Sequence, residues 1–425
     1  MGGDTLKSID LHLEYPAGEV VAVDEVVDVG AGIYPVYYYR RDGDVLVSTS
    51  VTELVHELGT FERNPDFDPP NFLTKSDHKS FLDRLVPLIP DVVRSPIPPT
   101  VAARLRDADL IGGTEDFYAS EETADRRISV LRPFERVTAT DRTQSFEPTY
   151  ELDDPEEFVE RSAREIQGFV NRIERRYPDR EHVIRVGGKD SQLIALAPKL
   201  APENWHVFSA EPNYPLVREF LEQNEVPMGE LFRHDNVNEE TPEEFRRKVV
   251  CGDLRASPRH QRWYPTLEDI VERFDGECVF WIGTAGDAFN RYYTKYHASG
   301  NFFGLHLSRA SKWVSITHQV TKNYTGAAAL SPYHSESIWE NLYRIHDPGL
   351  MSPGMDLRPE IAAQWYDRDL WWPEENPSPA PYDYDFGEDY HQLYYDYVEA
   401  YLGGETASVI RRNQSPQQTH SSTSR

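Results

Sequence analysis

The chain has 425 residues, with 44 Lys and Arg against 72 Asp and Glu, which gives a formal net charge of −28. Nucleic acids and anionic membranes bind surfaces with clustered positive charge, so this charge balance argues against both partners. A single hydrophobic core rarely grows beyond about 250 residues, and the length therefore favours two domains.

The acidic residues are spread along the whole chain, and only nine of the 44 basic residues are Lys. This pattern resembles the proteins of salt-in halophiles, in which dense carboxylates keep a surface hydrated in concentrated salt. The resemblance implies a haloarchaeal chain, or one from a haloarchaeal virus. The acidity would then reflect the solvent more than the partner, which weakens the argument against nucleic acid.

The chain has only two cysteines, Cys251 and Cys278, too few for a disulfide framework. No CxxC motif or Cys/His cluster indicates a zinc site. The start of the sequence lacks the apolar stretch of a signal peptide, and no run of about 18 apolar residues occurs. We expect a cytoplasmic protein with no membrane-spanning segment.

The first part of the chain is rich in predicted β-strands. Residues 20–50 read as strands, with Asp42-Gly43 at a hairpin turn and a helix expected over Val51–Leu58. Prolines are dense in residues 64–100, which indicates a connector. A further strand is expected within residues 126–140. These patterns predict a mostly β layer.

The pattern changes at Asp154, which can cap a helix that has Pro155 in its first turn and Glu157 three residues after the cap. Apolar residues then recur at helical spacing through Arg176. Strands and helices alternate afterwards, with strands expected at 182–186, 205–210, 230–235 and 278–283, and helices after Ser191 and near 214–224. Such alternation predicts a parallel sheet with helices on both faces, whose ligands bind beyond the carboxyl ends of the strands.

After Trp372 the sequence becomes rich in Pro and Tyr. One helix is expected there, over Glu388–Leu402. The last dozen residues have little apolar surface to bury and are expected to be disordered.

The stretch Arg185–Ser191, "RVGGKDS", turns from an expected strand directly into an expected helix. The N-terminus of a helix favours anions, and Gly187 and Gly188 allow the backbone to approach one closely. Lys189 adds positive charge and Ser191 a hydroxyl donor. The Asp190 carboxylate would need a cation between itself and a phosphate, as in sites where Mg²⁺ is held by carboxylates and substrate phosphates. The stretch therefore predicts a phosphate-binding loop, and the alternative is a plain glycine turn.

Val186–Ser191, "VGGKDS", resembles the SGGxDS signature of the PP-loop ATP pyrophosphatases, with Val186 in place of the first Ser. Within that superfamily the chain is most similar to the asparagine synthetase and β-lactam synthetase group. A second loop of that group, SGEGADE, resembles "GTAGDA" within Phe280–Phe289. The resemblance implies ATP and Mg²⁺ as cofactors, with Lys189, Asp190 and Asp287 catalytic, Asp190 and Asp287 as metal ligands, and nucleotide binding by Val186, Gly187, Gly188, Lys189, Ser191, Ser209 and Gly283.

The resemblance extends loosely over residues 20–372 and implies three parts. Residues 1–145 would form a β-rich, degenerate glutaminase-like domain of the Ntn type. Residues 146–378 would form a PP-loop synthetase domain, an adenine nucleotide alpha hydrolase-like parallel sheet with helices on both faces. Residues 379–425 would hold a helix and a disordered tail.

Two departures from the family pattern affect the expected chemistry. The glutaminase reaction needs an N-terminal cysteine, but this sequence starts Met1-Gly2-Gly3, and a glycine has no nucleophilic side chain. In the second loop, Thr284 and Ala288 replace the two glutamates, so a proton-accepting carboxylate is missing. The groups that would substitute for it are Lys295, Tyr292, Tyr293 and Lys322, and the sequence does not select among them.

The resemblance implies an ATP-dependent amide-forming ligase that works through an acyl-adenylate, with a small-molecule carboxylate and ammonia or an amine as substrates. We expect no nucleic-acid or membrane partner, and the sequence leaves a homodimer open. One alternative is a non-catalytic member that binds nucleotide or serves a structural role. Another is a PP-loop enzyme that modifies tRNA, which would need a basic or aromatic surface or a cysteine pair, and the sequence shows neither.

Overall fold

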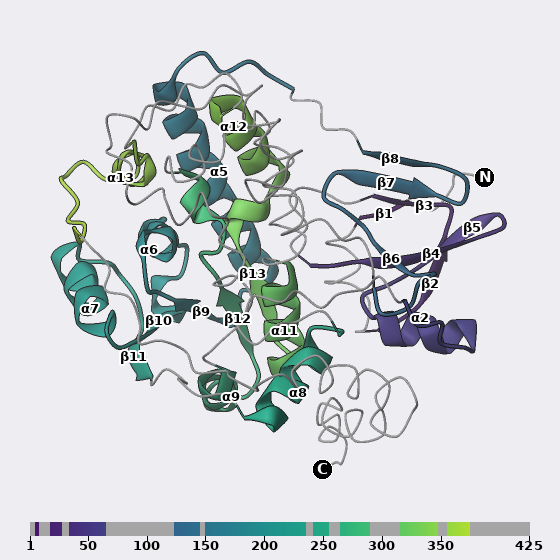
Figure 1. Cartoon of the computed structure of the whole chain (residues 1–425). Helices are drawn as coiled ribbons and strands as arrows, with labels where there is room; N and C mark the ends of the chain where they lie inside the picture. Colours follow the sequence, from purple (N-terminus) through teal and green to yellow (C-terminus); the bar gives the residue numbers. More distant parts are fainter. Residues whose placement is uncertain are drawn as a thin grey trace, which may run out of the picture.

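The chain folds into a β-rich region and an α/β region that pack against each other, on the right and left of Figure 1. The computed structural model describes residues 5–7, 18–27, 34–64, 123–144, 149–234, 241–254, 264–289, 315–346 and 355–374.

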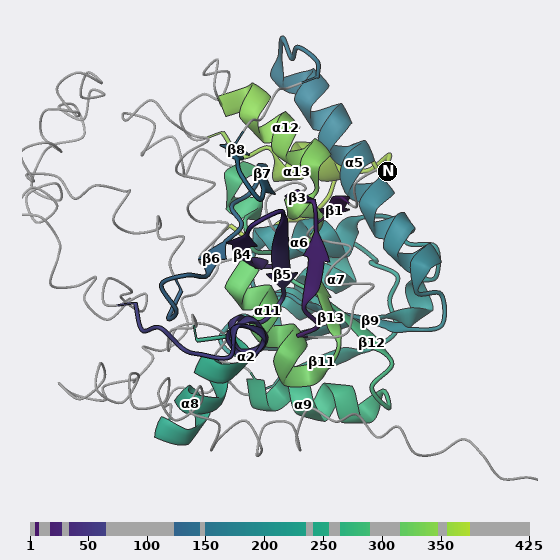
Figure 2. The ribbon, with the colours of Figure 1, turned by 90° about the vertical axis from the view of Figure 1, so that its right-hand side faces the viewer.

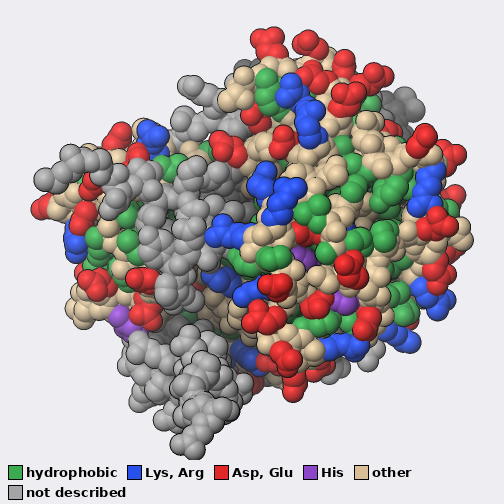
Figure 3. Space-filling view, turned by 180° about the vertical axis from the view of Figure 1, so that it is seen from behind, with side chains coloured by type: hydrophobic (Ala, Val, Ile, Leu, Met, Phe, Trp, Pro, Cys, Tyr) green, Lys and Arg blue, Asp and Glu red, His purple; other side chains and the backbone are tan. Residues whose placement is uncertain are grey.

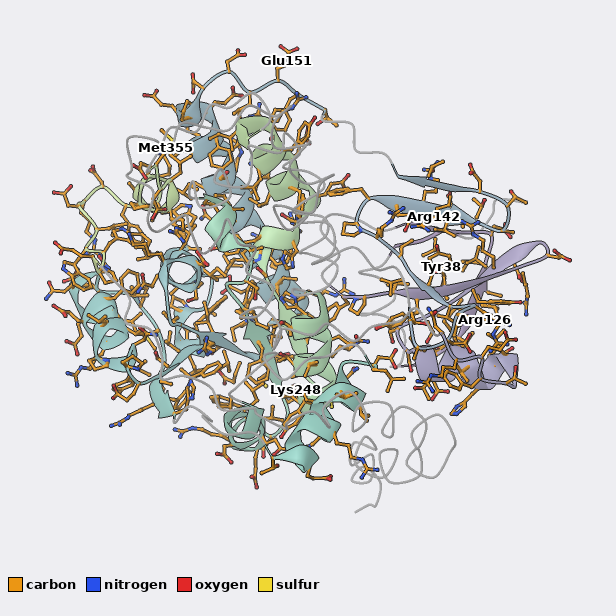
Figure 4. The ribbon with its side chains drawn as sticks, viewed as in Figure 1. Tyr38, Arg126, Arg142, Glu151, Lys248 and Met355 are labelled. Atoms are coloured by element: carbon orange, nitrogen blue, oxygen red, sulfur yellow. The ribbon has the colours of Figure 1, made fainter. Side chains whose placement is uncertain are left out.

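The β-rich region contains two four-stranded sheets. One has the order β1 (Thr5–Lys7), β3 (Glu25–Val27), β7 (Glu135–Thr138), β8 (Arg142–Gln144), and the other β2 (Val21–Val23), β5 (Asp44–Ser48), β4 (Tyr37–Arg41), β6 (Ser129–Val130). Val26 and Val137 of the first sheet share a buried core with Tyr38, Val45 and Val47 of the second, and Figure 4 labels Tyr38. The two sheets therefore face each other, and the mostly β layer predicted from the sequence is present.

The hairpin and the first helix agree with the sequence prediction. Strands β4 and β5 pair in antiparallel register up to Arg41 and Asp44, and Gly43 supplies the positive φ of 96° that the tight turn requires. Helix α2 (Val51–Leu58) follows, and the hydroxyl of Ser50 accepts a hydrogen bond from the Glu53 N–H at 3.3 Å as its N-cap.

The single strand expected within residues 126–140 is wrong. The chain there forms β6 in one sheet and β7 in the other, with a turn at Pro133 and Phe134 between them. Proline has no N–H to donate to a ladder, and Phe134 has a φ of 58°, which is outside the strand region. The break lets the chain pass from one sheet to the other.

The α/β region is built on a five-stranded parallel sheet, as the β-α alternation predicted. Its order is β11 (Leu231–His234), β10 (Trp205–Ala210), β9 (Glu181–Arg185), β12 (Cys278–Trp281), β13 (Ala328–Leu330). Every residue of β10 is buried, which is typical of a parallel strand covered on both faces.

Helices cover both faces of this sheet. Ile184 and Trp281 lie in one core with α5 (Pro155–Arg176), α6 (Lys189–Leu196), α7 (Tyr214–Gln223), α12 (Glu336–His346) and α13 (Arg358–Ala363). Val183 and Phe280 lie in the opposite core with α8 (Pro242–Cys251), α9 (Tyr264–Arg273) and α11 (Ser315–Thr325). In Figure 2, α5 and α12 lie above the parallel sheet, and α8 and α9 below it.

Helix α5 begins as the sequence predicted. The carboxylate of Asp154 accepts a hydrogen bond from the Glu157 N–H at 2.8 Å, Pro155 occupies the first turn, and the helix ends at Arg176. Its apolar stripe, which includes Phe158 and Ile166, is fully buried. Helix α5 packs on the same face of the sheet as α6.

The β-rich region covers the outer edge of the parallel sheet. The hydroxyl of Tyr34 donates to the carbonyl oxygen of Ala329 at 2.5 Å and accepts from its N–H at 2.7 Å. Ala329 lies on edge strand β13, where backbone groups would otherwise stay unpaired. Burial raises the pKa of Tyr34 well above its usual value, so the hydroxyl keeps its proton.

Two further contacts join the regions. Gln319 of α11 accepts from the Tyr37 hydroxyl at 3.2 Å and donates to the Thr49 carbonyl at 2.9 Å. The carboxylate of Asp253 accepts from the Ser50 hydroxyl and the Val51 N–H at the start of α2. Residues from both sides of position 145 also share a hydrophobic core, so the predicted domain boundary stays a prediction. That core contains Tyr37, Leu46, Leu54, Val249, Val250 and Leu254, among others.

Several expectations concern parts of the chain outside the described residues. These are the proline-rich connector, the C-terminal helix and tail, and Tyr292, Tyr293 and Lys295. Within the described ranges, no helix combines the length and apolar character needed to cross a bilayer. Figure 3 shows Asp and Glu side chains scattered over one face of the molecule, with Lys and Arg among them.

Tyr34→Phe should lower the free energy of unfolding by about 1–3 kcal/mol, because it leaves two buried backbone groups of β13 without their partner. Urea unfolding of both proteins measures the difference. Tyr39→Phe, at a half-buried tyrosine of β4, is the matched control and should change stability by less than about 0.5 kcal/mol. Equal stability of the Tyr34 variant and the native protein would show that the edge contact contributes nothing.

Candidate functional site

The site lies at the carboxyl ends of β9 and β12, where the strand order reverses direction. Strands β10 and β11 follow β9 on one side, whereas β12 and β13 lie on its other side. The connections after β9 and β12 therefore lead towards opposite edges of the sheet, and open α/β sheets have a crevice at such a point. Ligands of open α/β sheets bind in such a crevice.

The first loop runs from Val186 to Gly188 and leads directly into α6. The hydroxyl of Ser191 accepts from the N–H groups of Gly187 and Gly188, at 3.2 and 3.4 Å, and donates to the Gly188 carbonyl at 3.0 Å. The N–H groups of the first helical turn have no partner within a helix and carry partial positive charge. Ser191 shapes this loop from within, and α6 presents its N-terminus at the crevice.

The second loop starts at Gly283 and includes the short helix η5 (Gly286–Phe289). A Cβ atom on Gly283 would lie 2.6 Å from the backbone nitrogen of Ser191, and one on Gly286 would lie 2.7 Å from the Cβ of Asp190. Such distances are shorter than any ordinary contact, so glycine is required at both positions. The two loops thus pack backbone against backbone.

Asp287 follows Gly286 in η5, so its backbone lies next to Asp190. The side chain of Asp287 lies outside the described residues. Its expected approach to Asp190 is therefore supported at the level of the backbone, and the pairing of the two carboxylates stays a prediction.

A third segment adds a charged cluster that the sequence analysis missed. Nη1 of Arg358 donates to the Asp190 carboxylate, while Nε and Nη2 donate to the two carboxylate oxygens of Asp356 at 2.7 and 2.8 Å. Nζ of Lys189 lies 3.5 Å from Asp356. The Arg358 side chain is 8% exposed, whereas its partners Asp190 and Asp356 are 31% and 22% exposed, so the ion pairs are partly shielded from solvent. Two cations and two anions from distant parts of the chain meet here.

The pKa values in this cluster follow from burial and pairing. Burial of Asp356 works against ionisation, but the hydrogen bonds and charge of Arg358 outweigh it and lower the pKa of the carboxyl. Burial of Arg358 likewise lowers its pKa, and the two carboxylates more than reverse this. Both groups therefore stay charged at neutral pH.

Two more contacts fix the loops to each other. The hydroxyl of Tyr333, in η9 (Pro332–His334) after β13, donates to the backbone carbonyl of Asp190. Burial raises the pKa of Tyr333 well above its usual value, so it remains a donor. The N–H of Leu357 donates to the Phe289 carbonyl at 3.0 Å, which links the third segment to the second loop. Tyr333 and Leu357 were not singled out from the sequence.

The end of β10 lies beside the first loop. The Val186 N–H donates to the Phe208 carbonyl at 3.0 Å, which places Ser209 next to the loop. Nη1 of Arg185 and Nδ2 of Asn213 lie 3.7 and 3.9 Å from the position that a Cβ on Gly187 would take. An arginine and an amide thus flank the loop, and the sequence analysis had assigned neither a role.

The structure brings together most of the residues predicted for the site. The loop from Val186 to Ser191 meets Gly283, the backbone of Asp287 lies alongside, and Ser209 is the last residue but one of the neighbouring strand. Lys322, one of the suggested bases, lies on α11 on the other face of the sheet, with Nζ 5.4 Å from the ring centre of Tyr34. Burial lowers the pKa of Lys322 to about 8.

No protein-family model matches this chain, and no curated protein sequence matches it. Within the described ranges no group of three or more His, Cys, Asp or Glu side chains is arranged to hold a metal ion. A magnesium ion bound with a nucleotide needs only one or two carboxylates, because the phosphates supply other ligands. Asp190 can supply one, although it also pairs with Arg358.

Gly283→Ala should separate the two loops, because the new methyl group would meet the backbone of α6. We expect a loss of stability of about 1–3 kcal/mol and at least a tenfold loss of affinity for any ligand of the crevice. Thermal unfolding and ligand titration measure the two effects. Gly168→Ala is the control, since Gly168 lies inside α5 with no atom within 4 Å of its Cβ position, and alanine there should stabilise the helix slightly. If Gly283→Ala changed neither the stability nor the ligand affinity, the close contact between the two loops would be contradicted.

Arg358→Met should lower the free energy of unfolding by about 3 kcal/mol, because it leaves the Asp190 and Asp356 carboxylates without their shared cation. Chemical denaturation measures this loss. Arg218→Met, in an exposed pair with Glu222, is the control and should change stability by less than about 1 kcal/mol.

Arg358→Met should also change how the free energy of unfolding depends on pH. The pKa of Asp356 is lowered in the folded protein, so its contribution to stability is complete above the ordinary value of 3.8 and is lost as the pH falls through the lowered value. Without Arg358 that contribution should vanish, and stability should fall less steeply with pH below about 4. An unchanged acid dependence in Arg358→Met would contradict the assigned pairing.

Proposed function

We propose that the chain is an ATP-dependent, amide-forming ligase similar to asparagine synthetase, which works through an acyl-adenylate. The main support is the contact of two glycine loops at the point where the order of the parallel strands reverses. One loop opens a helix N-terminus, and the other brings a second aspartate to the same place. The finer assignment to the PP-loop and Ntn folds belongs to this proposal.

The first loop would hold the phosphates of ATP. The backbone N–H groups of Gly188 to Ser191 lie at the positive end of α6, and Lys189 provides a cation there. The site already holds Lys189 beside Asp356, and Arg358 adds a second, nearly buried cation. Positive groups fixed before the ligand arrives need little reorganisation when negative charge develops on a leaving pyrophosphate.

Asp190 and Asp287 would hold Mg²⁺, which neutralises charge on the leaving group when it is bound with the nucleotide. The Asp190 carboxylate has two oxygens, and Arg358 bonds to Oδ1. Tyr333 fixes the backbone of Asp190 through its carbonyl, so the carboxylate keeps its place in the crevice.

The proposed reaction has two steps. An oxygen of the substrate carboxylate attacks the α-phosphorus of ATP, the bond to the bridging oxygen breaks, and pyrophosphate leaves with the electron pair. Ammonia or an amine then attacks the acyl carbon, AMP leaves, and the nitrogen gives up a proton. Thr284 stands where the family has a carboxylate, and a hydroxyl is a poor base at neutral pH, so the proton acceptor is a different group.

A second candidate is a protein that binds nucleotide without turning it over. The pairing of Asp190 with Arg358 and the bonds of the Ser191 hydroxyl within its own loop both favour it, since these groups are engaged inside the chain. Thr284 and Ala288 also fit this alternative, because neither can accept a proton near an acyl group.

Pyrophosphate release from ATP with Mg²⁺ in concentrated KCl tests the proposal, with a screen of small carboxylic acids and of ammonium or amines. We expect release that depends on one acid and falls at least about a hundredfold in Asp190→Asn, which removes a charge that would bind the metal. Asp367→Asn, at an exposed aspartate beyond α13, is the control and should leave the rate unchanged.

The outcomes separate the two candidates. Release that requires an acid and Asp190 supports the ligase. Nucleotide that raises the melting temperature but is never cleaved favours the non-catalytic protein. If neither ATP nor pyrophosphate binds, the phosphate loop itself is wrong.

A further inference from the structure

Two buried polar side chains, Gln192 and Ser209, and the half-buried Asn213 belong to elements beside the first loop. Gln192 and Ser209 are 0% and 1% exposed. Within the described part of the chain, no hydrogen-bond partner reaches Nε2 or Oε1 of Gln192, Oγ of Ser209 or Oδ1 of Asn213. Both ends of the buried Gln192 carboxamide therefore lack a partner among the described residues.

A buried carboxamide without a hydrogen-bond partner lowers the stability of the folded protein. Buried polar atoms are nearly always hydrogen-bonded, and each one left without a partner costs about 1–3 kcal/mol. An apolar residue at position 192 would avoid the cost, since the neighbouring Leu193 and Ile194 are fully buried as well. The carboxamide of Gln192 therefore points to a partner that the described residues do not supply.

The place of Gln192 in α6 puts it close to the proposed phosphate loop. It follows Ser191 in the first turn of α6, directly after the phosphate loop. Ser191 contacts Gly283 on the β12 side, and successive helix residues are about 100° apart, so Gln192 is directed to a different side of α6. Figure 1 shows that α6 lies over β9 and β10.

Ser209 and Asn213 approach the same place from β10 and α7. Val207 belongs to the core beneath α6, and Ser209, two residues further along the strand, projects to the same face of the sheet. Asn213 precedes α7 and lies near Gly187 in the loop. The three side chains thus offer an amide donor and acceptor, a hydroxyl and a second amide next to a phosphate site.

We propose that Gln192 reads the base of the nucleotide and selects adenine over guanine, an inference that rests on the proposed function. A carboxamide pairs with the amino group N6 and the ring nitrogen N7 of adenine through one acceptor and one donor. Guanine presents two acceptors on that edge, O6 and N7, so Oε1 of Gln192 would face an acceptor. Ser209 and Asn213 contact the same nucleoside.

Calorimetric titration in KCl with Mg²⁺ tests this with four ligands: ATP, GTP, 7-deaza-ATP, which lacks N7, and inorganic tripolyphosphate, which lacks the nucleoside. The native protein should bind ATP at least about tenfold more tightly than GTP or 7-deaza-ATP. Gln192→Leu should bind these three nucleotides with similar affinity and should bind tripolyphosphate as the native protein does. Its melting temperature should be unchanged or higher, because a buried polar group is replaced by an apolar one.

Gln223→Leu, at an exposed glutamine at the end of α7, is the matched control and should keep the preference for ATP. The comparison of ATP with 7-deaza-ATP on the native protein needs no variant, so it decides the question even if Gln192→Leu fails to fold. If tripolyphosphate binds but ATP is no tighter than GTP and 7-deaza-ATP, the inference is wrong and the phosphate loop stands.

Two other results would also overturn the inference. A Gln192→Leu protein that keeps the full preference for ATP would show that the base is read elsewhere, and one that loses tripolyphosphate as well would show that Gln192 supports the loop itself. If the native protein binds neither tripolyphosphate nor any nucleotide, the proposed function fails and the inference fails with it.

Discussion

The contact between Gly283 and the backbone of Ser191 is the constraint on which the site depends. No side chain fits between the second loop and the start of α6, because even a methyl group would lie 2.6 Å from the Ser191 nitrogen. This contact brings the ends of β9 and β12 together at the point where the strand order reverses. The helix N-terminus of α6 and the backbone of Asp287 then share one crevice.

Ion pairs stabilise the site that the contact between Gly283 and Ser191 assembles. Arg358 pairs with Asp190 and Asp356, and Lys189 lies near Asp356, so the charge of the nearly buried Arg358 is neutralised by partly buried carboxylates. The same pairing engages the carboxylate that a metal would use, and for that reason both a catalytic and a purely binding role are consistent with one geometry.

The β-rich region supports the α/β region through direct contacts. Tyr34 satisfies the edge of β13, and Asp253 of the α/β region caps α2 in return. Hydrophobic residues of both regions form one core. The β-rich region therefore protects the β13 edge of the parallel sheet from being left unpaired.

The sequence by itself determined the elements whose signals are local. The cap at Asp154 and Pro155 sets the start of α5, Asp42-Gly43 sets the hairpin, and the alternation of strands and helices sets the parallel sheet. Two adjacent glycines before Lys189 likewise marked the first loop. Only the tertiary structure decided the partners of Asp190, because Arg358 lies 168 positions away, and ion pairing leaves no periodic pattern in a sequence. The environment of Gln192 was likewise decided only by the tertiary structure. Its amide is buried without a partner among the described residues, and burial depends on the whole fold.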